Sequence, residues 1–190
     1  MPGLRKVHVL AIQPYDYIRP DSGEGAGSII RIREAQRLLR LIIPKNALIV
    51  LPQGYGKKYP TVKLGRESLG MNIHLYLRTL TEMANLPIVQ DEMSWGTKND
   101  ILASYQMVAG LGYDLARFHF VSDEDHLRRV KLIWDKTHPK GWTAGFYPAS
   151  GYRMSVKERR VREPAARLVS NVTLSAGLFF FGRPVAEEFR

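Results

Sequence analysis

The chain has 190 residues, with a hydrophobic fraction of 45% and a charged fraction of 24%, as expected for one folded domain with its own core. It contains no cysteine, which excludes disulfide bonds and thiolate metal sites. We find no signal peptide and no apolar run of the roughly 20 residues that a spanning helix needs, so we expect a soluble, cytoplasmic protein. The formal net charge of +10 favours an anionic partner, either a nucleic acid, a phosphorylated metabolite or an acidic lipid surface.

Short apolar runs alternate with segments of helical spacing along residues 7–147. The loop at residues 14–28 is rich in Gly, Pro, Asp and Tyr and is long enough to be functional. The alternation predicts an α/β fold, a Rossmann-like three-layer sandwich with a mainly parallel five-stranded sheet and helices on both faces. The expected strands are residues 7–13, 47–51, 86–89, 117–121 and 143–147, and the expected helices are residues 29–42, 67–83, 100–111 and 125–136.

The C-terminal part predicts one more helix. Ser155 and Glu158 fit a capping box, and Pro164 is tolerated only near the start of such a helix or as a kink. We expect the tail through Phe179 to Phe181 to dock on the body, because three adjacent exposed Phe side chains would favour aggregation. We therefore predict a single domain over residues 1–190, in which residues 155–190 form a helical extension.

The turn after the fourth strand is the strongest candidate for a site. Ligands of open α/β sheets bind beyond the carboxyl ends of the strands, and a helix N-terminus there favours an anion. His126 has an ordinary pKa near neutrality and could act as general acid or base, while Arg129 could clamp a phosphate or carboxylate. Two alternatives stay open: Ser122 and Asp123 could simply cap the helix, and Arg129 could pair with a carboxylate of the same turn.

Other loops on the same side of the sheet carry further candidates. Right-handed crossovers bring these loops to one edge, and Arg31 in the first helix could point there too. Gly54 and Gly56 permit close approach of a ligand, although they also suit any tight turn. From these loops we add Glu92 as a catalytic candidate, and Gln53, Gly54, Gly56, Ser94, Thr97, Asn99 and Asp100 as candidates for substrate binding.

Several common sites have no pattern in this chain. His8, His74 and His119 fall inside expected strands or a helix, and we interpret them as structural. We find no metal-ligand spacing, no nucleophile elbow, no P-loop and no G-x-G-x-x-G after the first strand, so we expect neither a metal site nor ordinary dinucleotide binding.

The order and spacing of these motifs resemble the DUF218 (YdcF-like) family, the SanA/ElyC-related domain. The matching features are Arg31 and Ala35 in the first helix, the turn at residues 53–56, Gly65 to Ser68, the polar stretch from Glu92 to Asn99, and Ser122 with His126 and Arg129. Either Asn99 or Asp100 takes the family's Asn position, and one extra residue precedes His126. The resemblance covers roughly residues 7–150 and implies a Rossmann-like fold with charged residues at the sheet edge. It also implies links to cell-envelope metabolism and, through one member, binding of S-adenosylmethionine.

Three hypotheses of function follow. The first is an enzyme, a hydrolase or transferase, acting on a small phosphorylated or nucleotide-like substrate: Arg31 and Arg129 would hold the anion, His126 would move a proton, and Asp123 or Glu92 would orient it. The second is a non-catalytic binding module for S-adenosylmethionine or a nucleotide. The third, a nucleic-acid-binding protein, we rank last because the basic residues are split between distant helices. The sequence leaves the oligomeric state undetermined.

Overall fold

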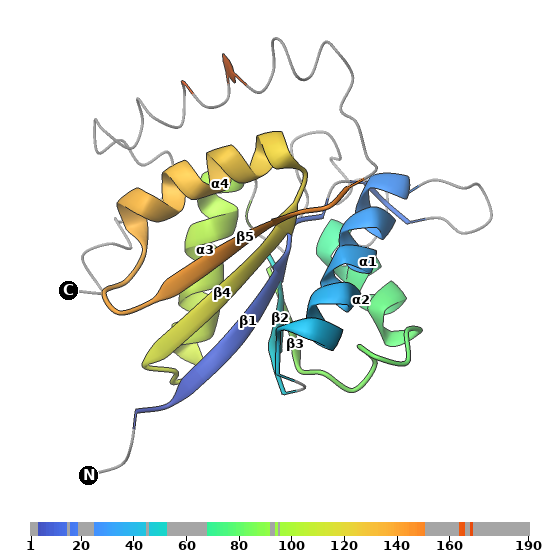
Figure 1. The fold of residues 1–190 in the computed structure, drawn as a ribbon, viewed down its shortest axis with the longest axis horizontal. Coiled ribbons are helices and arrows are strands. Elements are labelled where there is room, and N and C mark those ends of the chain that lie inside the picture. The colour runs from blue at the N-terminus through green and yellow to red at the C-terminus, as the bar shows by residue number, and fades with distance from the viewer. Residues whose placement is uncertain are drawn as a thin grey trace.

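The chain folds into a sheet whose two faces are covered by two pairs of helices (Figure 1). The computed structural model describes residues 4–14, 16–18, 25–44, 46–52, 68–91, 94, 96–150, 164–165 and 168. In the described parts the strands are β1 (Lys6–Ile12), β2 (Leu48–Leu51), β3 (Ile88–Gln90), β4 (Leu115–Ser122) and β5 (Thr143–Pro148). The helices are α1 (Ala26–Leu41), α2 (Leu69–Arg78), α3 (Thr97–Gly110) and α4 (Glu124–Thr137).

All strand pairings are parallel, and the strand order is β3-β2-β1-β4-β5. The predicted Rossmann-like α/β fold is therefore confirmed. From β1 the chain adds β2 and β3 on one side, then returns to place β4 on the other side of β1. Such a reversal is a topological switch point, where the connections after the two central strands leave on opposite faces and open a crevice.

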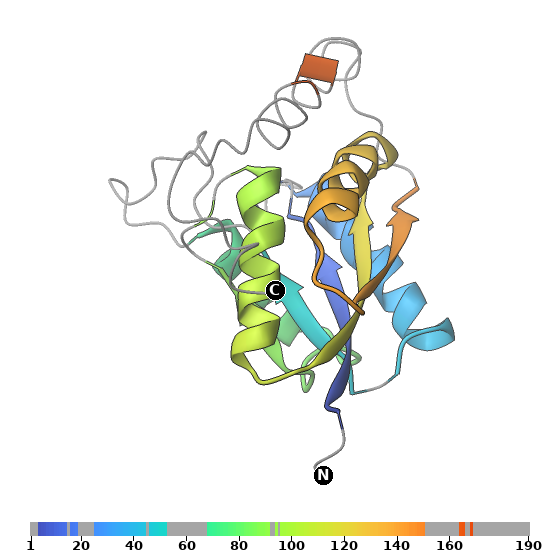
Figure 2. The ribbon, with the colours of Figure 1, turned by 90° about the vertical axis from the view of Figure 1, so that its left-hand side faces the viewer.

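Each face of the sheet packs against one helix pair. Val7, Val9 and Ala11 of β1 belong to the cluster that includes buried residues of α3 and α4, whereas Leu10 and Ile12 belong to the cluster with α1 and α2. This alternation follows from the two-residue period of a strand. A side view shows α3 and α1 on opposite sides of the strands (Figure 2).

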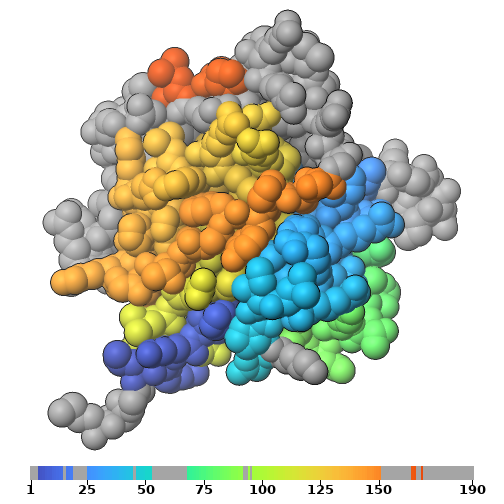
Figure 3. Space-filling view, in the orientation of Figure 1, coloured from blue at the N-terminus to red at the C-terminus, as the bar shows by residue number. Residues whose placement is uncertain are grey.

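The edge strand β5 is less covered than the centre of the sheet. Its residues 144–147 are only half-buried, and β5 lies at the surface beside α1 in the space-filling view (Figure 3). Between the sheet and α3 and α4, the core contains Tyr105, Phe118 and Trp134, whose ring centroids lie 5.4–5.9 Å apart.

The five strands and four helices expected over residues 7–147 are all present, and the largest differences in boundaries include the starts of two helices. α1 begins at Ala26 and α3 begins at Thr97, so Arg31 lies in the second turn of α1, and Thr97 and Asn99 belong to a helix rather than to a loop. Both helices begin after a glycine with positive φ, Gly25 at 97° and Gly96 at 87°. Such starts carry no Ser, Thr or Asp capping signal, which explains the late predicted starts.

Two other expectations concern the ends of elements. The helix expected at residues 67–83 is shorter, since α2 ends at Arg78. The predicted helix from residue 155 and the docking of residues 179–181 lie outside the described residues, apart from 164–165 and 168, and stay predictions. Within the described part of the chain, none of the helices has the length and apolar character required to cross a membrane.

Candidate active site at the carboxyl edge of the sheet

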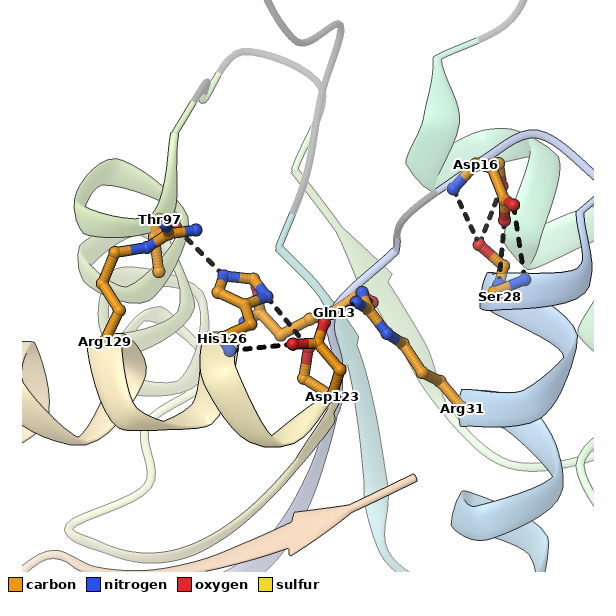
Figure 4. Close-up of polar contacts among 10 residues, drawn as sticks. Gln13, Asp16, Ser28, Arg31, Thr97, Asp123, His126 and Arg129 are labelled. Carbon is orange, nitrogen blue, oxygen red and sulfur yellow. Dashed lines mark hydrogen bonds and ion pairs between the residues drawn. The ribbon is translucent and has the colours of Figure 1, made fainter. Parts of the chain in front are cut away.

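The candidate residues meet where β1 and β4 end, at the topological switch point (Figure 4). Ile12 and Val121 are register partners, so Gln13 and Ser122 leave adjacent strands side by side. The backbone N–H of Gln13 donates to the carbonyl of Val121 at 3.2 Å, which continues the ladder one step beyond β1. Three helices, α1, α3 and α4, then supply side chains to this edge.

A buried ion pair joins α1 to the start of α4. Arg31 Nη2 donates to Asp123 Oδ2 at 2.5 Å, and Arg31 Nη1 donates to the backbone carbonyl of Gln13. Asp123 Oδ1 accepts from the backbone N–H of His126 at 2.8 Å and so caps α4. One carboxylate thus caps a helix and neutralises an arginine that is only 2% exposed.

The imidazole of His126 lies between two hydroxyl groups. Its Nδ1 is 2.9 Å from Ser122 Oγ, and its Nε2 is 3.0 Å from Thr97 Oγ1. Thr97 Oγ1 also accepts from Arg129 Nε at 2.9 Å. The result is a continuous hydrogen-bonded chain from Arg129 through Thr97 and His126 to Ser122.

The surroundings keep His126 neutral. Burial lowers its pKa well below the ordinary value of 6.5, and the positive charges of Arg129 and Arg31 lower that pKa further. Because Thr97 can donate its single hydroxyl proton to Nε2, the ring can carry its own proton on Nδ1 and donate to Ser122. In that tautomer Nε2 is a base that faces the Thr97 hydroxyl; the opposite tautomer makes Nε2 the donor.

The helix N-termini at this edge differ in how they are capped. The carboxylate of Asp16 accepts from the N–H groups of Gly27 and Ser28 at the start of α1, and Ser68 caps α2. Asp123 caps α4, so the chain's own carboxylate fills the anion seat that we expected there. α3 begins after Gly96, which has no side chain to cap it. The first backbone N–H groups of α3 belong to the turn that begins at Thr97, whose hydroxyl accepts a hydrogen bond from Arg129.

A second polar cluster ties α3 to the end of β2. Ser94 Oγ is 2.9 Å from the carbonyl of Pro52 and 2.8 Å from Asp100 Oδ1. A hydroxyl has one proton, and the Pro52 carbonyl can only accept. Both contacts are satisfied together when Asp100 is protonated and donates to Ser94. Burial indeed raises the pKa of Asp100 well above its ordinary value of 3.8, and the charge of Asp91 adds to this effect.

The predicted site residues therefore divide into groups. Arg31, Ser122, Asp123, His126, Arg129 and Thr97 meet in one network, and Ser94 and Asp100 form the adjoining cluster. Asn99 lies half-buried in the first turn of α3. Glu92, Gln53, Gly54 and Gly56 lie outside the described residues.

Two expected roles change with this geometry. Asp123 contacts the backbone N–H of His126 rather than its ring, so the hydroxyls of Ser122 and Thr97 are what orient the imidazole. The charge of Arg31 is offset by Asp123, because both of its terminal nitrogens bond within the protein. In the described part of the chain, no group of three or more His, Asp or Glu side chains could hold a metal ion.

Sequence reasoning missed Gln13. Its side chain is fully buried at the switch point, and neither Nε2 nor Oε1 has a hydrogen-bond partner within the described structure. The available signal was a polar residue placed directly after an apolar strand and directly before Pro14.

The ion pair predicts strong energetic coupling between Arg31 and Asp123. Arg31→Met should lower the free energy of unfolding by about 3–5 kcal/mol, because it leaves a buried carboxylate without its partner. Adding Asp123→Asn should cost less than the sum of the single changes, as measured by urea unfolding in a double-mutant cycle. Arg128→Met is the matched control, since that arginine pairs with Glu124 at the surface and should change little. Strict additivity at positions 31 and 123 would contradict the proposed coupling.

The raised pKa of Asp100 predicts a pH dependence of stability. A folded-state pKa above the unfolded value means that the native chain binds the extra proton, so this group's contribution falls as pH rises above about 3.8 towards the folded pKa. Asp100→Asn keeps a donor for Ser94 and should remove that fall. The variant should therefore gain stability relative to the parent protein as pH is raised, in urea melts from pH 4 upwards. Asp135→Asn, at an exposed ion pair, is the control. An unchanged difference between parent and variant at every pH would show that folding does not raise the pKa of Asp100.

Comparisons with models of protein families, with curated proteins and with solved structures return no significant match.

Proposed function

We propose that this protein is an enzyme acting on a small anionic substrate, phosphorylated or nucleotide-like, at the carboxyl edge of the sheet. The observation that carries the proposal is the chain from Arg129 through Thr97 to His126. It joins a cation, a hydroxyl and a neutral base at a topological switch point, which is where open α/β sheets bind their ligands.

The electrostatics favour an anion beside α3. Among the groups of the network, Arg31 and Asp123 offset each other, and burial favours the neutral forms of His126 and Asp100. Arg129 brings a guanidinium within hydrogen-bond distance of Thr97, the first residue of α3, where the helix dipole also favours an anion. A phosphate oxygen there would accept from backbone N–H groups and from a guanidinium, a combination that recurs at phosphate sites.

The chemistry that the site can perform is proton transfer. A neutral imidazole with a lowered pKa keeps its lone pair in mildly acidic solution, as a general base requires. In the tautomer with the proton on Nδ1, His126 Nε2 accepts the proton of the Thr97 hydroxyl, or of a substrate hydroxyl or water that takes the place of Thr97. Ser122 holds the ring, and Arg129 stabilises the negative charge that develops beside Thr97.

The resemblance to the DUF218 family supports the same location, because its matching positions include Arg31, Ser122, His126 and Arg129. That family's general reaction is not settled, so hydrolase and transferase chemistry both fit the proposal. The alternative is a binding module for S-adenosylmethionine or a nucleotide at the same seat, which would bind its ligand saturably and form no product.

Removing Arg129 should weaken anion binding. Arg129→Ala deletes a charge-assisted hydrogen bond, worth about 1.5–3 kcal/mol, and should weaken binding by roughly 10- to 100-fold. The measurement is the rise in melting temperature with inorganic phosphate, sugar phosphates, nucleotides and S-adenosylmethionine, since a ligand of the folded state stabilises it by mass action. Arg128→Ala, one position away on the exposed side of α4, should bind as the parent protein does. Equal shifts in both variants would place the anion elsewhere.

Removing the base should affect turnover more than binding. His126→Gln can still bond to Thr97 and Ser122 but cannot take a proton at neutral pH, so kcat should fall by roughly 10²- to 10⁴-fold while KM changes little. In the parent enzyme, kcat/KM should decline only below pH 6.5, because the lowered pKa keeps the base unprotonated above that value. His138→Gln, at the far end of α4, is the control. Full turnover in His126→Gln would refute the assignment, and a ligand that binds the parent protein without reaction would favour the binding module.

A further inference from the structure

Among the described residues at the switch point, Gln13 is the buried polar side chain that the network leaves unused. It is 0% exposed, and both Nε2 and Oε1 lack a hydrogen-bond partner within the described structure. A buried polar group without a partner destabilises the fold, so such groups are rare in folded proteins. Its backbone, in contrast, is fully engaged, by Val121 and by Arg31.

The side chain of Gln13 continues onto the face of the sheet that also carries the proposed anion seat. The residues of β1 with odd numbers, Val7, Val9 and Ala11, pack in the cluster with α3 and α4. Because side chains alternate along a strand, the next odd residue, Gln13, continues onto that face. The same face carries Thr97 at the start of α3 and His126 at the start of α4, and Figure 4 draws Gln13 between the Arg31–Asp123 pair and His126.

The two ends of a carboxamide have different requirements. Nε2 donates two hydrogen bonds, whereas Oε1 only accepts. A phosphate dianion offers acceptors alone, so it could satisfy Nε2 and would leave Oε1 without a donor. A sugar hydroxyl donates and accepts at once, and neighbouring hydroxyls could satisfy both ends of the amide.

We propose that Gln13 contacts the substrate beside its phosphate, and that the substrate is therefore a phosphorylated polyol, with hydroxyl groups next to the phosphate, rather than a phosphate monoester with an apolar tail. The inference rests on the proposed function, because it uses the anion seat at α3 and Arg129 to place the phosphate. Gln13 then supplies the selectivity: a site built to bond to hydroxyl groups rejects analogues that lack them, since its own buried polar atoms would stay unpaired.

The test compares binding of four probes to three proteins by calorimetric titration. The probes are inorganic phosphate, hexyl phosphate, ribose phosphate and adenosine monophosphate, of which the last two share the hydroxyls but differ in the base. The proteins are the parent, Gln13→Met, which keeps the length of the side chain without its polar atoms, and Gln106→Met, a matched change at an exposed position on α3.

The parent should bind ribose phosphate or adenosine monophosphate at least about tenfold more tightly than hexyl phosphate, and Gln106→Met should do the same. Gln13→Met should lose this preference while it keeps its affinity for hexyl phosphate.

The ligand-free protein provides a second readout. Because Gln13→Met removes two unpaired buried atoms, it should raise the melting temperature, by about 2–4 °C for a chain of this size. A variant that is less stable than the parent would show that the amide is bonded within the fold, and would overturn the inference.

The remaining outcomes separate the two proposals. If the parent binds hexyl phosphate as tightly as ribose phosphate, or if Gln13→Met keeps the preference, the role of Gln13 is wrong while the anion seat stands. If the parent binds none of the four probes, the inference fails together with the proposed function. A preference for adenosine monophosphate over ribose phosphate would identify the polyol as part of a nucleotide.

Discussion

The buried pair of Arg31 and Asp123 is the contact on which the carboxyl edge of this protein depends. It joins the helix that follows β1 to the helix that follows β4, across the point where the sheet reverses its order. A buried ion pair is a poor source of net stability, because desolvating two charges cancels much of their attraction. The pair instead fixes the geometry of this edge. Because Asp123 caps α4 and its partner Arg31 bonds to the carbonyl of Gln13, the start of α4 has a fixed position relative to β1.

That fixed start determines the surroundings of His126. Ser122 precedes Asp123, and His126 lies one turn into α4, so the cap geometry brings the hydroxyl and the imidazole within 2.9 Å of each other. The second hydroxyl comes from α3, on the same side of the sheet, and its contact with Arg129 places a cation beside the base. Burial and nearby positive charge then lower the pKa of His126, which favours the neutral imidazole. The proposed proton transfer follows from this electrostatic setting.

At the same edge, local capping bears on where the proposed anion would bind. The chain supplies its own carboxylates to the N-termini of α1 and α4, and a serine to α2. α3 begins after Gly96, which itself has no side chain to serve as a cap, and its first turn carries Thr97. Together with the amide of Gln13, which has no partner within the described structure, this arrangement is the basis on which we propose a phosphorylated polyol as substrate. The substrate class is thus inferred from which protein groups are already satisfied and which are not.

The sequence alone determined the order and type of the secondary structure elements, because strands buried on both faces must be apolar throughout and their helices must repeat every three to four residues. It also placed Asp123 and His126 correctly at the start of α4, since a cap and its turn are local features. Only the tertiary structure could pair Arg31 with Asp123 or bring Thr97 to His126, because these contacts join segments 92 and 29 residues apart. The start of α3 after Gly96 escaped prediction because a glycine cap carries no side-chain signal. Gln13 escaped because its local signal, a polar residue between an apolar strand and Pro14, does not show that the amide lacks partners, which depends on what surrounds it in space.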